Sequence, residues 1–125
     1  MLTIIGSVIA GLIAAGIIGV GAGYVWAPQR AAAFGIPRPP VADQAFRSWV
    51  RVKGGRDIGC GVFTAIVLGY GSAHLLGWFM VAAVVLPVGD AIVVLSSGGA
   101  KSTAYGIHAA TAAVMLAGAI FLLVG

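Results

Sequence analysis

The chain has 125 residues, enough for one domain, and its composition is that of a membrane protein. Hydrophobic residues make up 61% of it and charged residues 8%, and its mean hydropathy is +1.11, whereas globular domains hold roughly 45–50% apolar residues. The net charge of +4 does not indicate nucleic-acid binding, because the basic residues flank apolar stretches and no nucleic-acid motif accompanies them. Anionic lipid headgroups are the expected counter-charges. With Cys60 as its only cysteine, the chain can form neither an internal disulfide nor a cysteine-based metal site.

Four apolar stretches predict an all-α, polytopic membrane protein, a bundle of four transmembrane helices formed by residues 1–125 as a single domain. A helix needs about 20 residues to cross the hydrocarbon core of a bilayer. The predicted spans cover about residues 2–26, 54–70, 75–95 and 103–124. No Lys or Arg precedes the first span, as it would in a cleavable signal peptide, so this span is expected to be retained.

The connections between the spans hold the helix-breaking residues. Residues 27–45 include four prolines and predict an irregular loop. Asp43 is a suitable N-cap, so the second helix is expected to begin near residues 43–46, before it enters the membrane. The turn at residues 71–73 is very short, which makes spans two and three antiparallel neighbours, and residues 96–102 separate spans three and four.

The basic residues predict the orientation. All seven lie between spans one and two, at the start of span two, or between spans three and four. By the positive-inside rule the basic loops are cytoplasmic and both termini lie on the non-cytoplasmic side. We therefore expect a multi-pass protein of the bacterial inner membrane.

Small residues recur every four positions in three spans and predict faces for close helix packing in lipid. They are Ser7, Gly11, Ala15, Gly19 and Gly23 in span one, Gly55 and Gly59 in span two, and Ala109, Ala113 and Ala117 in span four. Packing within the bundle is the favoured interpretation, and a homo-oligomer interface is the alternative.

Four ionisable residues lie inside the predicted spans, namely Arg56, Asp57, Asp90 and His108. Charge at membrane depth is costly, so such residues generally serve a function. These residues come from three helices. Counting inward from the end of each span that adjoins a basic loop places their side chains within about 10 Å of the membrane surface. We therefore expect these side chains to converge in one pocket.

Other residues are expected to border this pocket. Pro87, three positions before Asp90, removes a helix hydrogen bond and predicts a kink that makes room near the carboxylate. Helical spacing and depth add Tyr24, Trp49, Lys53, Cys60 and Tyr105 as predicted ligand-binding residues.

Each polar residue also has a structural interpretation. Arg56 can extend to the headgroups with Asp57 as its surface neighbour, or form an interhelical salt bridge with Asp90. His108 can be a hydrogen-bonded packing residue. His74 lies on the opposite side of the membrane from His108, so the two cannot share a metal ion, and no metal or other cofactor is predicted.

Three motifs carry a resemblance to a known family. They are Arg51-Val52-Lys53-Gly54-Gly55-Arg56-Asp57-Ile58, Pro87-Val88-Gly89-Asp90-Ala91 and Gly106-Ile107-His108. From about Tyr24 onward the chain resembles the small bacterial and fungal membrane proteins of the DUF4267 family, a resemblance that implies no function. In size and number of spans it is also similar to DoxX-like four-helix membrane proteins, some of which are linked to quinone or redox metabolism.

These observations lead to three hypotheses about function. The first is a pocket in the cytoplasmic half of the bundle that binds a small apolar or amphiphilic molecule, or acts on it through acid–base chemistry with Arg56, Asp57, Asp90 and His108 as catalytic residues. Limonene-type epoxide hydrolases combine two carboxylates and an arginine on an unrelated fold, so by analogy the expected reaction is an epoxide-type hydration or an isomerisation. The second is an accessory or structural membrane subunit with a buried salt-bridge network. The third is a small proton-coupled transporter, which the absence of a polar trail in the outer halves of the spans disfavours.

Overall fold

The computed structural model describes all 125 residues, and every regular element in it is helical. In chain order the elements are α1 (Leu2–Trp26), the 3-10 helix η1 (Pro28–Phe34), α2 (Gln44–Tyr70), α3 (Ala73–Ala83), α4 (Val85–Ser96), α5 (Lys101–Thr103), the π-helix η2 (Ala104–Ala109) and α6 (Ala110–Val124). A proline-rich loop joins η1 to α2.

Short polar residues define where α2 and α3 begin. The Asp43 carboxylate accepts a hydrogen bond from the Phe46 N–H at 2.7 Å and caps α2, as the sequence predicts. Ser72 caps α3 in the same way through the Leu75 N–H at 3.1 Å. These caps satisfy backbone donors that have no partner inside the helix.

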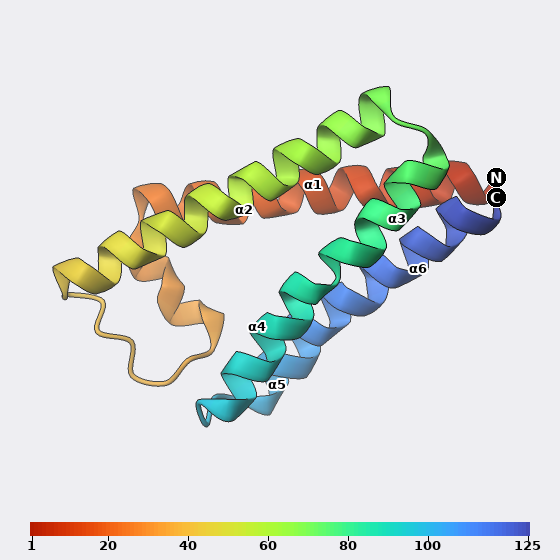
Figure 1. Cartoon of the computed structure of the whole chain (residues 1–125). Coiled ribbons are helices and arrows are strands. Elements are labelled where there is room, and N and C mark those ends of the chain that lie inside the picture. The colour runs from red at the N-terminus through yellow and green to blue at the C-terminus, as the bar shows by residue number, and fades with distance from the viewer.

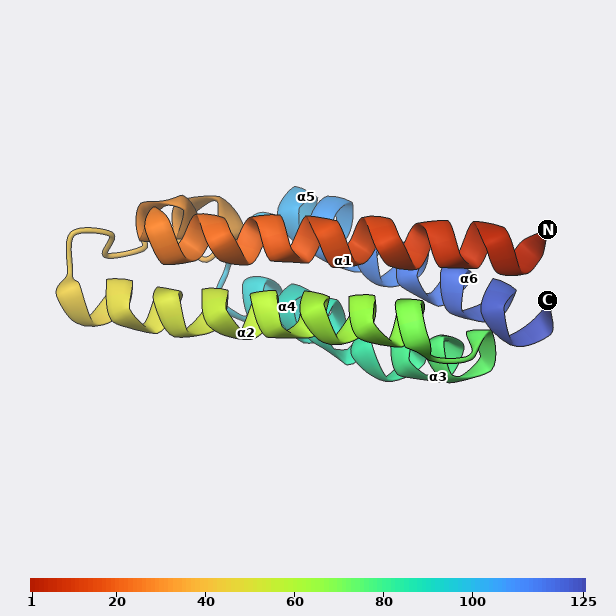
Figure 2. The ribbon, with the colours of Figure 1, turned by 90° about the horizontal axis from the view of Figure 1, so that it is seen from above.

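The helices form two antiparallel hairpins that cross as a wedge (Figure 1). α1 and α2 lie side by side along their length (Figure 2), and α3 with α4 lies beside α5 with α6. The hairpins meet at the end where both termini lie and diverge toward the end that holds η1 and the proline-rich loop. The arrangement therefore differs from the compact four-helix bundle expected from the sequence, because contact between the hairpins is concentrated at one end.

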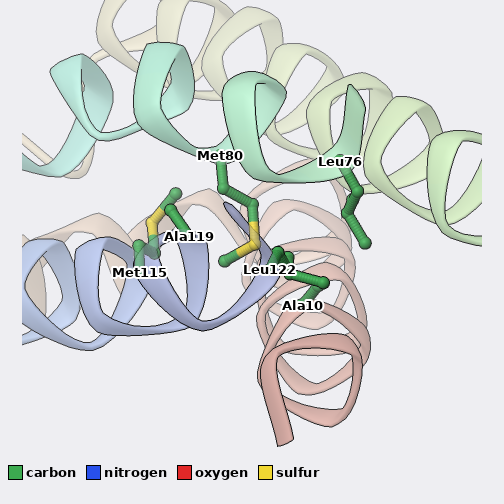
Figure 3. Packing of buried hydrophobic residues seen from close by; sticks show 6 residues of the cluster. All are labelled: Ala10, Leu76, Met80, Met115, Ala119 and Leu122. Atoms are coloured by element: carbon green, nitrogen blue, oxygen red, sulfur yellow. The ribbon is translucent and has the colours of Figure 1, made fainter. Parts of the chain in front are cut away.

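A buried apolar cluster holds the closed end of the wedge together. It consists of Ala10, Leu76, Met80, Met115, Ala119 and Leu122, which come from α1, α3 and α6 (Figure 3). Ala10 and Ala119 are fully buried, so their small side chains let these helices approach closely. In lipid such contacts stabilise through packing, because lipid tails are as apolar as the side chains themselves.

Glycines set the spacing of α1 and α2. A Cβ atom on Gly54 would lie 2.5 Å from the Gly21 carbonyl oxygen, so here backbone touches backbone. Packing within the bundle, the favoured interpretation of the small-residue faces, is wrong for some of their members. Ala15 and Ala113 are exposed, and no atom lies within 4 Å of a Cβ built on Gly55. Small residues repeat every four positions on several faces of these helices. The face that packs against the adjacent helix is a neighbour of the predicted one.

Pro87 interrupts the third long helical segment. Because proline has no N–H, the carbonyl of Ala83 loses its usual partner, and the segment divides at Val84 into α3 and α4. The helix is therefore interrupted three residues before the proline itself.

Three helical segments are long and apolar enough to cross a membrane, namely Leu2–Trp26, Ala73–Ser96 and Lys101–Val124. These segments mark a membrane protein whose helices face lipid. α2 is as long as the others but differs in carrying Lys53, Arg56 and Asp57 near its middle.

We predict that Gly54→Ala lowers the thermal stability of the purified protein, whereas Gly55→Ala leaves it unchanged or raises it. The methyl group at position 54 would meet backbone and force α1 and α2 apart, at a cost of about 1–3 kcal/mol. At position 55 it meets open space, and alanine favours the helix by about 0.5–1 kcal/mol. Melting curves in detergent measure the thermal stability of both variants. Equal effects of the two substitutions would contradict the packing of α1 against α2.

Candidate functional site

A cavity of about 570 Å³ lies where the hairpins diverge, with walls from α1, α2, η1, the α3–α4 segment and the η2–α6 segment. Sites for small molecules generally measure about 300–1,000 Å³. Its wall is apolar along α1 and toward the closed end. Leu12, Val20, Leu86 and Ile107 line it and are 45–68% exposed, so the cavity opens sideways between the helices.

All four ionisable residues predicted inside the spans line this cavity, and so do Tyr24, Lys53 and Cys60. Asp57 is 14% exposed and is held by Lys53, whose Nζ lies 2.8 Å from the carboxylate Oδ2. The Lys53 ammonium also lies 5.2 Å from the ring centroid of Phe34 and 5.5 Å from that of Tyr24. Aromatic faces attract a cation in this way, so Lys53 has three partners.

His108 is fixed from one side by backbone. Its Nε2 lies 2.9 Å from the carbonyl oxygen of Phe34, and the two rings lie 4.7 Å apart. A carbonyl oxygen can only accept, so Nε2 donates its hydrogen there. The other ring nitrogen, Nδ1, lies 4.0 Å from Oδ2 of Asp90. His108 is thus held in one orientation, with Nδ1 on the side of Asp90.

His108 belongs to the π-helix η2. Such wide turns are rare and are frequent at functional sites. The Pro87 interruption borders the same cavity from the other segment of this hairpin, since Ala83 and Pro87 both line it. Both departures from α-helical geometry therefore lie at the cavity wall. Pro87 signals its own effect in the sequence, whereas nothing in residues 104–109 predicts a π-helix.

The structure decides one of the two structural interpretations of Arg56, its salt bridge with Asp90. Arg56 is exposed and lines the cavity, but neither ion pair of the structure includes it. The considered Arg56–Asp90 salt bridge is absent. Asp57 pairs with Lys53 instead, because residues four apart lie on the same helix face while adjacent residues are about 100° apart.

Two predicted ligand-binding residues lie outside the cavity. Trp49 is 71% exposed and Tyr105 is 59% exposed, and neither lines the wall. Trp49 shares a helix face with Lys53 but lies one turn nearer the end of α2, beyond the wall. Tyr105 points outward because the wide η2 turn changes its direction relative to His108.

Sequence reasoning missed Phe34 and Thr64, which also line the cavity. Phe34 supplies a carbonyl and a ring, yet it lies in a segment predicted to be irregular, where no spacing rule applies. Thr64 donates its hydroxyl hydrogen to the Cys60 carbonyl at 2.8 Å, so its polar group is satisfied. No three His, Cys, Asp or Glu side chains gather as a metal ion would require.

Comparison with known proteins identifies the family. Neither the curated proteins nor the solved structures include a match to this chain, so no comparison shows the expected likeness to DoxX-like proteins. A family model described as a domain of unknown function, DUF4267, matches residues 14–122. The matched range includes all the predicted site residues that line the cavity, namely Tyr24, Lys53, Arg56, Asp57, Cys60, Asp90 and His108. The chain belongs to the DUF4267 family.

Proposed function

We propose that the cavity binds a small apolar or amphiphilic molecule taken from the bilayer, and that Asp90 and His108 act on it as an acid–base pair. The observation that carries this proposal is the asymmetry of the cavity wall. Its apolar part comes from α1 and the closed end, while its ionisable groups gather toward the open end of the wedge. An amphiphile entering sideways would place its apolar part against α1 and its reactive polar part at Asp90 and His108.

We infer that α2 crosses the membrane as a fourth span. α1, α3–α4 and α5–α6 are the apolar candidates. Gly125 lies against Leu2 and Thr3, and both termini are at one end of the molecule (Figure 1). With three membrane crossings the two termini would lie on opposite sides of the membrane. Termini on the same side require an even number of crossings, so α2 must cross as well. Its charged middle faces the cavity, which lowers the cost of inserting it. The basic end would then face the cytoplasm and both termini the other side.

The two carboxylates have different surroundings, which suits them to different roles. Asp57 is engaged by Lys53 at 2.8 Å and would orient the site as a fixed anion. Asp90 forms its one ion pair with His108, at 4.0 Å, and is 34% exposed. It is therefore the carboxylate that remains free to take a proton from a bound molecule.

The reaction class proposed is hydration of an apolar epoxide. Asp90 removes a proton from water, whose oxygen bonds to a ring carbon while that carbon's bond to the epoxide oxygen breaks. The protonated His108 gives its Nδ1 proton to the epoxide oxygen, and the product is a diol. Asp90 then returns its proton to His108, so the pair is restored. An isomerisation would use the same two groups without water.

The ion pairs support a pocket over an accessory subunit stabilised by charges. Lys53 and Asp57 both belong to α2, so their pair joins no two helices. The ion pair of His108 with Asp90 is the one that joins two helical segments. Its distance of 4.0 Å between Nδ1 and Oδ2 is longer than a hydrogen bond. A network that locked the bundle would instead bridge α2 to the other hairpin.

We predict that Gly16→Trp closes the cavity and that Gly19→Trp does not. Both glycines are on α1 with no atom within 4 Å of an added Cβ, but Gly16 lines the cavity and Gly19 does not. The readout is the rate at which N-ethylmaleimide labels Cys60, the single cysteine, which also lines the cavity. Labelling should slow at least about tenfold in Gly16→Trp only. Equal rates in both variants would argue against an open cavity.

We predict that Asp90→Asn abolishes hydrolysis of limonene oxide, an apolar epoxide, while Asp43→Asn keeps it. Losing the general base should reduce turnover about 10²–10⁴-fold, whereas asparagine caps a helix as well as aspartate does at position 43. Diol formation by the reconstituted protein is measured by gas chromatography. His108→Gln should also be inactive, because its amide can still donate to the Phe34 carbonyl but cannot exchange a proton. Turnover at the wild-type rate by Asp90→Asn or by His108→Gln would refute the acid–base role.

A further inference from the structure

A second, smaller cavity of about 320 Å³ lies at the open end of the wedge. Its walls are the proline-rich loop, η1 and the first turns of α2, and it shares Tyr24, Phe34 and Lys53 with the larger cavity. We propose that this cavity is a binding site for the headgroup of an anionic lipid, with the lipid phosphate at Arg38. The proposal does not depend on the chemistry of the larger cavity.

The charge of the wall selects an anion. Arg38 and Lys53 are the charged residues that line the cavity, and no carboxylate lines it. The Lys53 ammonium already bonds Asp57 at 2.8 Å, whereas Arg38 takes part in neither ion pair. A guanidinium presents paired N–H donors in a plane, which matches two oxygens of a phosphate. Arg38 is thus the group in this wall whose charge is available to a ligand.

The backbone at Arg38 points to the same role. Its φ is +52°, in the left-handed region, and it is the one residue other than glycine with a positive φ. Pro37 and Pro39 flank it and restrict the chain on both sides. A bulky residue in this conformation is strained, and such residues cluster at ligand-binding sites. The loop therefore holds the arginine at the cavity despite a local cost.

The depth and polarity of the cavity indicate a lipid as the source of the phosphate. Trp26 ends α1 and is 81% exposed, and Trp49 is 71% exposed near the start of α2, at the same end of the molecule. Exposed tryptophans of this kind lie at the level of lipid headgroups. Most of the remaining wall is apolar, including Phe46, Val50 and Val93. This surface suits the glycerol backbone and first methylenes of a lipid, which a free phosphate lacks.

The test compares lipid retention by the full chain in detergent, using native mass spectrometry. The probes are dioleoylphosphatidylglycerol and dioleoylphosphatidylcholine, with glycerol 3-phosphate as the free phosphate ester. We expect the wild-type protein to retain one phosphatidylglycerol in preference to phosphatidylcholine. Arg38→Asn should weaken this retention at least about fivefold, because it removes a charge-assisted contact with the phosphate. Asparagine adopts the left-handed conformation readily, so the loop keeps its shape.

Arg47→Gln is the matched control, because Arg47 belongs to the same basic end but lines neither cavity. It should retain phosphatidylglycerol within about twofold of the wild-type level, since its charge is only part of the general attraction. Arg38→Gly serves as a second variant that relieves the backbone and should behave like Arg38→Asn. Equal losses in Arg47→Gln and Arg38→Asn would overturn the site in favour of diffuse charge. Equal retention of the two lipids, or displacement of phosphatidylglycerol by equimolar glycerol 3-phosphate, would overturn the lipid assignment.

Discussion

The two hairpins are fastened to each other at one end, and the rest of the structure follows from that constraint. Ala10, Met80 and Ala119 bring α1, α3 and α6 into close contact near the termini. Helices that touch at one end and cross at an angle must separate toward the other. The interruption at Val84 divides the third segment on the way. The larger cavity is therefore a consequence of the packing at the closed end, and η1 lies between the diverging hairpins (Figure 1).

The polar groups in this space are stabilised by local partners. Lys53 meets a carboxylate and two aromatic rings, and His108 meets a backbone carbonyl. Each of these contacts compensates part of the cost of removing a charge or a polar group from water. Phe34 contributes to both sets, through its ring and its carbonyl oxygen. A short segment outside the long helices thus positions side chains from both hairpins.

The sequence predicted the helices better than their contacts. Composition and spacing were sufficient for the limits of α1, the Asp43 cap and the effect of Pro87, because these depend on residues close in the chain. Depth counting placed Arg56, Asp57, Asp90 and His108 at one level, and they line one cavity. The partners were harder to predict. The pairing of Asp57 with Lys53 and the contact of His108 with Phe34 depend on side-chain direction and on an irregular segment, for which periodicity carries no information.

The π-helix has a consequence for how this family can vary. A π turn accommodates one residue more than an α turn, and each residue of a helix turns it by about 100°. The direction of His108 is therefore set separately from the face of α6 that carries Met115 and Leu122. Insertion or loss of a single residue normally scrambles every contact beyond it in a membrane span. At residues 104–109 the same event would rotate one half of the span and leave the buried half in register, so the half that lines the cavity at His108 can change direction while the packed half keeps its contacts.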